Sequence, residues 1–155
     1  MGGTLVGVIS DTHGLMRPEA LRALAGVSWI LHAGDVGAPE VLEALGAIAP
    51  VTAVRGNIDV EPWAAKLPGQ TVVPIDGARV CMVHQAEMLN GEPEREHWQA
   101  VISGHSHKAV SEFRGGVLYL NPGSAGPRRF RLPVTLALLK VIDGEPQAEI
   151  LTLMR

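Results

Sequence analysis

The stretch "TLVGVISDTHG" at residues 4–14 decides the fold. Residues 4–10 form an apolar run about as long as one strand, and a run without alternation is typical of a strand buried on both faces. The run ends in a polar cluster that contains Asp11 and His13. A buried strand that delivers polar groups at its end predicts a ligand site at the carboxyl edge of an open sheet.

Further along the chain, an apolar run with a polar end occurs twice more, and a helical segment precedes each run. Residues 17–26 predict a helix, because Pro18 fits its first turn, apolar residues recur at helical spacing, and Gly26 can end it. Residues 28–35 predict a second strand, 38–48 a second helix and 51–57 a third strand. This alternation is the signature of a parallel sheet with right-handed crossovers.

The second half of the chain reads differently. Glycines at 77, 115–116 and 144 separate pairs of apolar runs, which predicts three hairpins over 71–84, 108–121 and 133–154. Residues 92–100 predict a short helix, and 101–107 predict a further strand with a polar end. We therefore expect a strand-rich, largely antiparallel second half.

Composition excludes several classes of protein. The length of 155 residues predicts one domain spanning 1–155. With 46% hydrophobic and 19% charged residues the chain is expected to fold rather than stay disordered. A net charge of −3 argues against an extended nucleic-acid surface.

The single cysteine, Cys81, lies in an apolar run and excludes a disulfide framework. No basic segment precedes the first apolar run, so we expect no signal peptide. No stretch approaches the ~18 apolar residues of a membrane span. These features predict a cytoplasmic protein without a membrane partner.

Seven potential metal ligands follow the apolar runs, each at or near the end of a predicted strand. They are Asp11, His13, Asp35, Asn57, His84, His105 and His107. Residues i and i+2 of an extended segment point the same way, so we expect Asp11 with His13, and His105 with His107, to act as pairs. Gly56 is expected to let the chain turn sharply enough to present Asn57.

The ligand chemistry indicates the kind of metal. Two carboxylates, one amide and four imidazoles are too many for one ion but suit two ions that share a carboxylate. Mixed nitrogen and oxygen ligands without thiolate favour Mn, Fe, Zn, Ni or Co over calcium or a structural zinc site. Two ions ~3.5–4 Å apart form the arrangement that clamps the attacking and leaving oxygens in phosphoryl transfer.

The motifs "DTHG", "GDV", "RGNID", "VH" and "GHSH" occur in this order and resemble those of the calcineurin-like metallophosphoesterase superfamily. The stretch "NPGSAGPRR" at 121–129 is similar to a turn of the small bacterial and archaeal phosphodiesterases. The resemblance runs from about residue 6 to 129. It implies an α/β fold, a four-layer αββα sandwich of two mixed β-sheets flanked by helices, with one sheet built mainly from the first half of the chain and one from the second.

The resemblance also implies roles for the ligands. One metal would be held by Asp11, His13 and His107. The second would be held by Asn57, His84 and His105, and Asp35 would bridge the two. A hydroxide between the ions would attack the phosphorus of a small phosphodiester, so that Asp35, Asn57 and His105 act catalytically through the metals. Mn²⁺ is the first choice of metal, and Asn57 can also donate its NH₂ group to the substrate phosphate.

Two positions depart from the family pattern. Many relatives carry a histidine after the asparagine, where it can protonate the leaving oxygen, but Ile58 stands here. This predicts a preference for good leaving groups, or a proton from water or another residue. Asp59, expected to be exposed with an ordinary pKa, would be a poor acid at neutral pH. Gln85 stands where relatives often have glycine, and it can narrow the site or present an amide to the substrate.

Other polar residues have structural interpretations. His32 is expected to be a packed or hydrogen-bonded strand residue rather than an eighth ligand, and His97 a surface residue of a helix. The pair Arg128 and Arg129 can bind phosphate or form surface salt bridges, and the second reading is preferred. The Asn121-Pro122-Gly123 turn is expected to be structural.

Three functions compete. The first is a dinuclear metal-dependent phosphodiesterase. The second is a non-catalytic, protein-binding scaffold similar to the retromer subunit of this superfamily, which would be expected to have lost ligands. The third is a phosphomonoesterase. A homodimer is compatible with the apolar composition, and the sequence does not identify the natural substrate.

Overall fold

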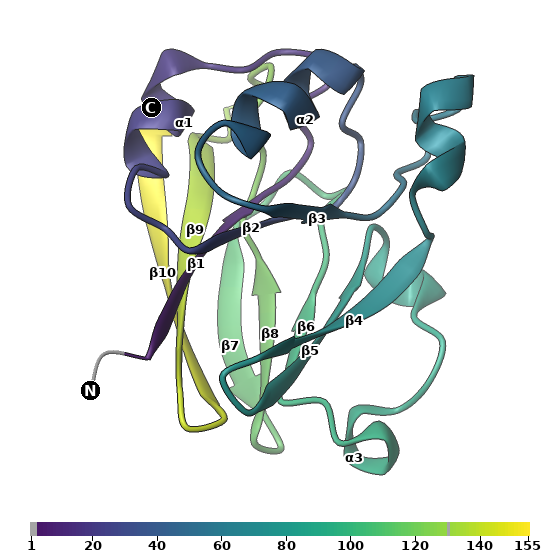
Figure 1. Ribbon diagram of the computed structural model, residues 1–155, viewed down its shortest axis with the longest axis vertical. Helices are drawn as coiled ribbons and strands as arrows, with labels where there is room; N and C mark the ends of the chain where they lie inside the picture. Colours follow the sequence, from purple (N-terminus) through teal and green to yellow (C-terminus); the bar gives the residue numbers. More distant parts are fainter. Residues whose placement is uncertain (1–2, 130) are drawn as a thin grey trace.

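The computed structural model describes residues 3–129 and 131–155, and it forms a sandwich of two five-stranded sheets (Figure 1). Sheet A has the order β10-β9-β1-β2-β3 and sheet B the order β4-β5-β6-β8-β7. Two helices, α1 (Pro18–Ala23) and α2 (Pro39–Gly46), lie on the outer side of sheet A. The predicted αββα sandwich of two mixed sheets is confirmed.

The first half of the chain folds as its pattern predicts. Strands β1 (Thr4–Ile9), β2 (Trp29–His32) and β3 (Val51–Ala53) pair in parallel, and α1 and α2 make the crossovers. All three strands point their carboxyl ends to one edge of sheet A. This edge receives the polar segments after residues 9, 32 and 53.

The last hairpin departs from the prediction. Strands β9 (Val134–Ile142) and β10 (Glu145–Met154) join sheet A, and β9 pairs antiparallel with β1, with Val6 opposite Leu139. Sheet A is still built mainly from the first half, as expected, but this hairpin from the second half adds two of its five strands. The reason is burial: Leu139 faces the core between the sheets and Leu136 faces the helices, so β9 needs an interior position.

Sheet B is mixed rather than largely antiparallel. Its two hairpins form as predicted, β4 (Gln70–Ile75) with β5 (Ala78–Val83), and β7 (Val110–Arg114) with β8 (Val117–Asn121). Strand β6 (Ala100–Ile102) lies between them and pairs in parallel with both β5 and β8. Local turn signals predict hairpins but not the parallel pairing between them, and that pairing directs β5 and β6 toward the same edge.

Three packed clusters hold the layers together. The largest lies between the sheets and includes Val8, Leu31, Met82 and Ile102. A second joins α1 and α2 to sheet A. A third covers the outer face of sheet B, where Trp98 packs with the buried Cys81. The short elements η1 (Pro62–Lys66), η2 (Ala86–Met88) and α3 (Pro93–Glu96) complete the fold.

The helix predicted over 92–100 is shortened to one turn. His97 ends α3 in the left-handed conformation with φ of 61°, so it is the exposed terminal cap rather than a residue on a helix face. Trp98 then turns into the outer cluster of sheet B at 5% exposure, and β6 begins two residues later. The burial of one large side chain overrides the local helical preference. Over the described ranges, no helix is both long and apolar enough to cross a membrane.

Candidate metal centre

The seven predicted ligands meet where the carboxyl ends of the strands of both sheets converge. Sheet A supplies four of them from the segments after β1, β2 and β3: Asp11, His13, Asp35 and Asn57. Sheet B supplies three from the segments after β5 and β6: His84, His105 and His107. The site therefore bridges the two sheets.

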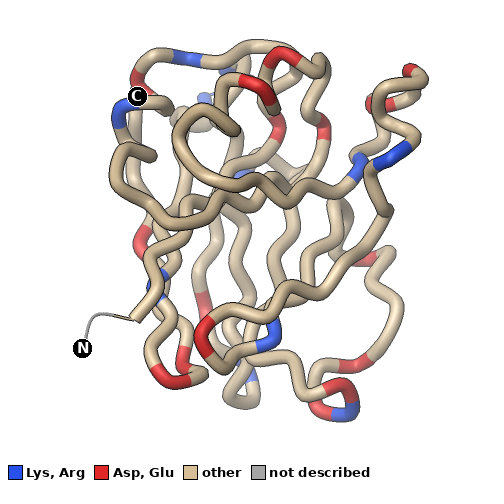
Figure 2. The backbone as a smooth tube through the Cα atoms, in the orientation of Figure 1, with Lys and Arg blue, Asp and Glu red and all other residues tan. Residues whose placement is uncertain are grey.

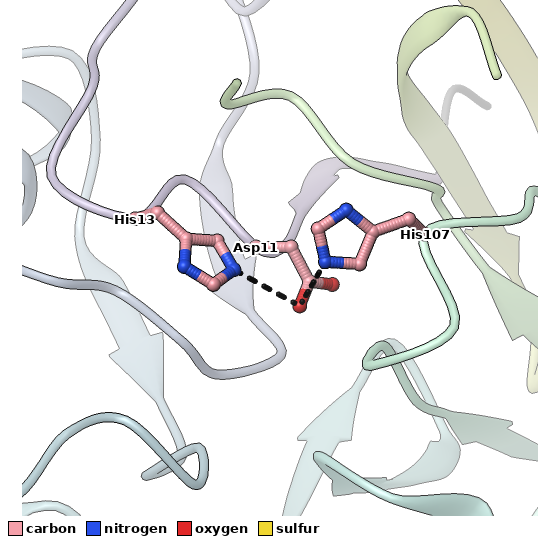
Figure 3. Close-up of side chains that lie close together, drawn as sticks. All are labelled: Asp11, His13 and His107. Atoms are coloured by element: carbon pink, nitrogen blue, oxygen red, sulfur yellow. Dashed lines mark ion pairs between the residues drawn. The ribbon is translucent and has the colours of Figure 1, made fainter. Parts of the chain in front are cut away.

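The first group consists of Asp11, His13 and His107, whose potential ligand atoms all lie within 4.8 Å of one another. Figure 3 shows the two imidazoles on either side of the Asp11 carboxylate. The oxygen Oδ1 of Asp11 lies 3.9 Å from His13 Nε2 and 3.5 Å from His107 Nε2. Such spacings suit ligands that surround a cation better than direct hydrogen bonds.

The second group consists of Asp35, His84 and His105. Asp35 Oδ2 lies 3.3 Å from His84 Nε2. His84 Nδ1 lies 2.7 Å from the carbonyl oxygen of Ala33, a contact in which the ring nitrogen must donate. That bond leaves the Nε2 lone pair of the neutral ring free to bind a metal, as outer partners of metal-ligating histidines commonly do.

Asn57 completes the second group. One end of its side-chain amide lies 3.1 Å from His84 Nε2, 3.3 Å from His105 Nδ1, and 3.2 and 3.3 Å from the two Asp35 oxygens. Every one of these neighbours offers a lone pair. Either the NH₂ group donates to them, or the oxygen of Asn57 shares a cation with them; the second arrangement is the one expected of a metal ligand.

Asp35 lies between the two groups. The same oxygen, Oδ2, lies 3.5 Å from His13 Nε2 in the first group and 3.3 Å from His84 Nε2 in the second. Asp11 Oδ1 is also 3.8 Å from His84 Nε2. The two groups therefore form one continuous cluster in which Asp35 is central.

Unpaired buried atoms test whether this cluster fits metal ions. Asp11 Oδ1 and His13 Nε2 are buried without a hydrogen-bond partner. A buried polar atom left unpaired costs ~1–3 kcal/mol, and more if it is charged. Both atoms face the centre of the first group, where a divalent cation would satisfy them. The donor set is also free of thiolate, so the residues fit transition-metal ions with mixed nitrogen and oxygen ligands.

Protonation behaviour indicates the same attraction for positive charge. Burial acts to lower the pKa of His84, but its hydrogen bonds to Asp35 and to the Ala33 carbonyl outweigh burial and raise it. Burial acts to raise the pKa of Asp35, but hydrogen bonds from His84 and from the Ile58 N–H lower it. His107 is the exception, because burial, the largest cause, lowers its pKa.

The backbone at the ligands is not extended. Asp11, His13, Asp35, His105 and His107 all have positive φ, from 47° to 72°. Asp11 and His13 do lie together in the first group, whereas His105 and His107 belong to different groups. Neither arrangement results from an extended backbone, because the strands end before the ligands begin. Each non-glycine residue in the left-handed region costs about 1 kcal/mol, a cost that clusters at functional sites.

Asp59 is buried, contrary to the expectation, at 1% exposure. Its carboxylate accepts three backbone N–H bonds, from Val36 at 3.0 Å, Gly37 at 2.9 Å and Gly56 at 2.9 Å. These donors belong to the loops that carry Asp35 and Asn57. Asp59 is thus a positioning residue that joins the two loops, and only its place two residues after Asn57 marks it in the sequence.

The turn at 121–124 supports the other side of the site. Asn121 donates to the Gly104 carbonyl at 3.0 Å and to Ser106 Oγ at 3.2 Å, and so holds the loop of His105 and His107. Ser124 Oγ donates to the backbone carbonyl of Asp11 at 3.1 Å. The turn is structural, as expected, but it acts directly on the loops that carry the ligands.

Close packing explains Gly56 better than a sharp turn does. Gly56 has no positive φ, and a Cβ at this position would collide with the backbone and the carboxylate of Asp35. Gly104 is similar, because a Cβ there would collide with Ser10 Oγ. That hydroxyl donates to Asp11 Oδ2 at 2.7 Å. Sequence reasoning missed Ser10, which is the residue directly before the first ligand.

His32 lies in a buried hydrogen-bond chain, as expected. Its Nδ1 accepts from the Gly34 N–H at 3.1 Å, so its Nε2 carries the proton and donates to Thr12 Oγ1 at 3.0 Å. Thr12 in turn donates to the Val36 carbonyl at 2.8 Å. This chain connects the loops after β1 and β2.

The two departures from the family pattern both lie at the site. Ile58 is 36% exposed, and its backbone N–H donates to Asp35 Oδ1 at 3.1 Å. Gln85 places its amide nitrogen 3.1 Å from His105 Nε2. Ile58 therefore contributes its backbone to the site, and Gln85 contributes its side chain.

Arg128 and Arg129 are exposed, and over the described ranges neither forms a salt bridge. Arg128 donates instead to the backbone carbonyl oxygen of Arg155 at 2.6 Å. Both arginines are thus surface residues, and Arg128 is held by a main-chain oxygen rather than by an acidic side chain. Basic segments are scattered over the molecule rather than gathered along one stretch (Figure 2).

A two-sheet sandwich with carboxylates and imidazoles clustered at its strand ends is the arrangement expected of a metallophosphoesterase. Residues 5–144 match the calcineurin-like phosphoesterase superfamily domain. A probable metallophosphoesterase of Methanothermobacter thermautotrophicus is 35% identical over 153 residues, covering 91% of this chain and 87% of the relative. The chain belongs to the calcineurin-like phosphoesterase superfamily, as its motifs predicted.

Further comparisons agree with this assignment. Phosphodiesterase YfcE of Escherichia coli (strain K12) is 30% identical over 156 residues, covering 84% of each chain. The crystal structure of Chaetomium thermophilum Vps29 has the same fold, with a TM-score of 0.77 at 21% identity, covering 98% of this chain and 99% of that one.

Proposed function

We propose that the protein is a dinuclear metal-dependent phosphodiesterase, and the central position of Asp35 carries this proposal. One carboxylate oxygen lies within 3.5 Å of an imidazole in each group. A carboxylate shared by two ligand groups is what a two-metal site requires. We assign Asp11, His13 and His107 to one metal and Asn57, His84 and His105 to the other, with Asp35 bridging and Mn²⁺ as the first metal to test.

The residues prepare the site for a phosphate ester in three ways. The two metals, when bound, would lower the pKa of water and neutralise charge on the phosphoryl oxygens. Asn57 can ligate through its oxygen and donate its NH₂ group to a phosphoryl oxygen. Ile58 offers no proton to the departing oxygen, so substrates with good leaving groups are expected to react best.

Two hollows on either side of the second group favour a diester over a monoester. A cavity of about 370 Å³ includes Asn57, His84 and Gln85 in its wall. A second, of about 600 Å³, includes His105 and extends to Tyr119. Gln85 lines the first hollow and contacts His105, which lines the second. A diester has two substituents, and each hollow can hold one.

The test is hydrolysis by protein loaded with Mn²⁺. We expect bis-p-nitrophenyl phosphate to be cleaved faster than p-nitrophenyl phosphate. Because removal of a bridging or metal-ligating group disables the site, Asp35→Ala and His105→Ala should each reduce the rate at least ~100-fold. His97→Ala, a substitution at an exposed histidine outside the site, is the matched control. Faster cleavage of the monoester would make the protein a phosphomonoesterase.

A protein-binding scaffold is the second candidate, favoured by the similarity of fold to Vps29 and by exposed apolar side chains near the site. Val60 is 80% exposed and Leu15 is 40% exposed. A scaffold does not need a complete ligand set, however, and all seven ligands are present here. Failure to hydrolyse either ester with Mn²⁺, Fe²⁺, Zn²⁺, Ni²⁺ or Co²⁺ would support the scaffold and contradict the enzyme.

A further inference from the structure

The smaller of the two hollows has an unusual charge. Among the residues that the structure describes, its wall contains one cation, Arg55, and no aspartate or glutamate. The larger hollow, in contrast, includes Glu87 and Glu112 as well as Arg114. The whole chain has a net charge of −3, yet this hollow beside the candidate metal centre is positively charged. Such a hollow favours anionic groups over neutral ones.

Arg55 is held in place on both its backbone and its side chain. Its backbone N–H donates to the Pro68 carbonyl at 2.8 Å, and its guanidinium nitrogen Nη1 donates to the Leu67 carbonyl at 3.1 Å. Over the described ranges, Arg55 lies in no salt bridge. A guanidinium has five N–H donors, so most of them stay available to a ligand in the hollow.

A second part of the wall is also fixed by hydrogen bonds. The Gln70 amide donates to the Asn90 carbonyl at 2.8 Å, and its oxygen accepts the Asn90 N–H at 2.9 Å. This pair connects the start of β4 to the segment after η2. Val83 and Met88 add apolar surface. The hollow therefore combines an apolar lining with a single anchored cation.

The hollow is continuous with the second metal group, because Asn57 and His84 belong to both. Arg55 is only two residues before Asn57. We propose that this hollow binds one ester substituent of the substrate, and that this substituent carries its own anionic group, a carboxylate or a second phosphate, paired with Arg55. This inference rests on the proposed function, since it names the substrate class of the same site.

The test uses binding rather than turnover. Phenylphosphonate and its 3-carboxy and 4-carboxy derivatives have a phosphonate for the metals and an aryl group for the hollow, and they cannot be hydrolysed. Calorimetric titration of the Mn²⁺-loaded protein should show the better carboxylated probe binding about tenfold tighter, the gain of one charge-assisted contact. Arg55→Gln should remove this preference, and Arg55→Lys should keep part of it.

Arg79→Gln is the matched control, because it removes the same charge from an exposed position at the amino end of β5, away from the ligand edge. It should keep the tenfold preference. Equal affinity for all three probes, or a preference that survives in Arg55→Gln, would overturn the inference. Hydrolysis of bis-p-nitrophenyl phosphate by the same samples reports separately on the proposed function, so the two failures are distinguishable.

Discussion

His32 shows at the scale of one residue how the site is kept in a single protonation state. It is fully buried, and burial lowers its pKa to about 4. Both ring nitrogens are engaged in the neutral form, one as acceptor and one as donor. A proton on Nδ1 would break the bond from Gly34 and charge a buried ring.

This predicts a loss of stability in mild acid for the metal-free protein. The folded pKa of about 4 lies below the ordinary value of 6.5, so the unfolded chain binds the extra proton first. The contribution of neutral His32 to the free energy of unfolding is fully present above pH 6.5 and is lost as the pH falls toward 4. Between pH 7 and pH 5 the loss should be about 2 kcal/mol.

Urea unfolding at the two pH values measures this loss. In His32→Gln the difference in the free energy of unfolding between pH 7 and pH 5 should shrink by about 2 kcal/mol. The control His97→Gln, at an exposed histidine, should keep the wild-type difference. An unchanged pH dependence in His32→Gln would show that His32 is not the responsible group.

At the scale of elements, the loops after β2 and β3 act as one unit because Asp59 binds both. Its carboxylate accepts N–H bonds from Val36, Gly37 and Gly56. An asparagine offers only one acceptor oxygen and would turn an N–H group toward one of these donors. A buried donor without an acceptor costs ~1–3 kcal/mol.

Asp59→Asn should therefore lower the free energy of unfolding by about 2 kcal/mol and weaken metal binding about 10- to 100-fold. Chemical denaturation and a metal titration measure the two effects. Glu61→Gln, an exposed acid two residues further on, is the control and should change neither. Destabilisation without weaker metal binding would mean that Asp59 supports the fold but does not position the ligands.

Sequence patterns predict which helices and strands are present in this fold better than they predict the residues at which those elements end. Hydrophobic patterns indicate which residues are buried, and the buried apolar runs correctly predicted β1 and its parallel neighbours β2 and β3. The ends depend on single residues. His97 stops α3 early because Trp98 must reach the outer cluster, and the ligands turn left-handed directly after the strands. Such turns depend on contacts across the molecule, which a local pattern does not contain.

At the scale of the whole molecule, the candidate metal centre joins the two sheets. Sheet A supplies Asp11 and Asp35, and sheet B supplies His84 and His107. The family motifs single out these residues as candidate ligands, since their chemistry and order are visible in the sequence. The supports Asp59 and Ser10 were not predicted as such, because their roles depend on backbone donors and packing brought together only by the fold.

Metal binding should therefore stabilise the whole protein. At a free metal concentration 100 times the dissociation constant, ligand binding adds about 2.7 kcal/mol. For a chain of this size, that raises Tm by roughly 5–10 °C. Calorimetry of the chelator-treated protein with and without Mn²⁺ measures the shift. In Asp35→Ala, Mn²⁺ should raise Tm by less than half as much. An equal rise in Tm would mean that the metal binds at a site without Asp35.

The pairing of β9 with β1 has a consequence for synthesis on the ribosome. Strand β1 is made first, yet its antiparallel neighbour ends at Ile142, more than 130 residues later. Until then one edge of sheet A stays open, and open edges invite pairing with other chains. Every ligand has been made by residue 107, but the sheet that holds four of them is incomplete. We expect the candidate metal centre to become complete only when the last hairpin pairs with β1 and closes that edge.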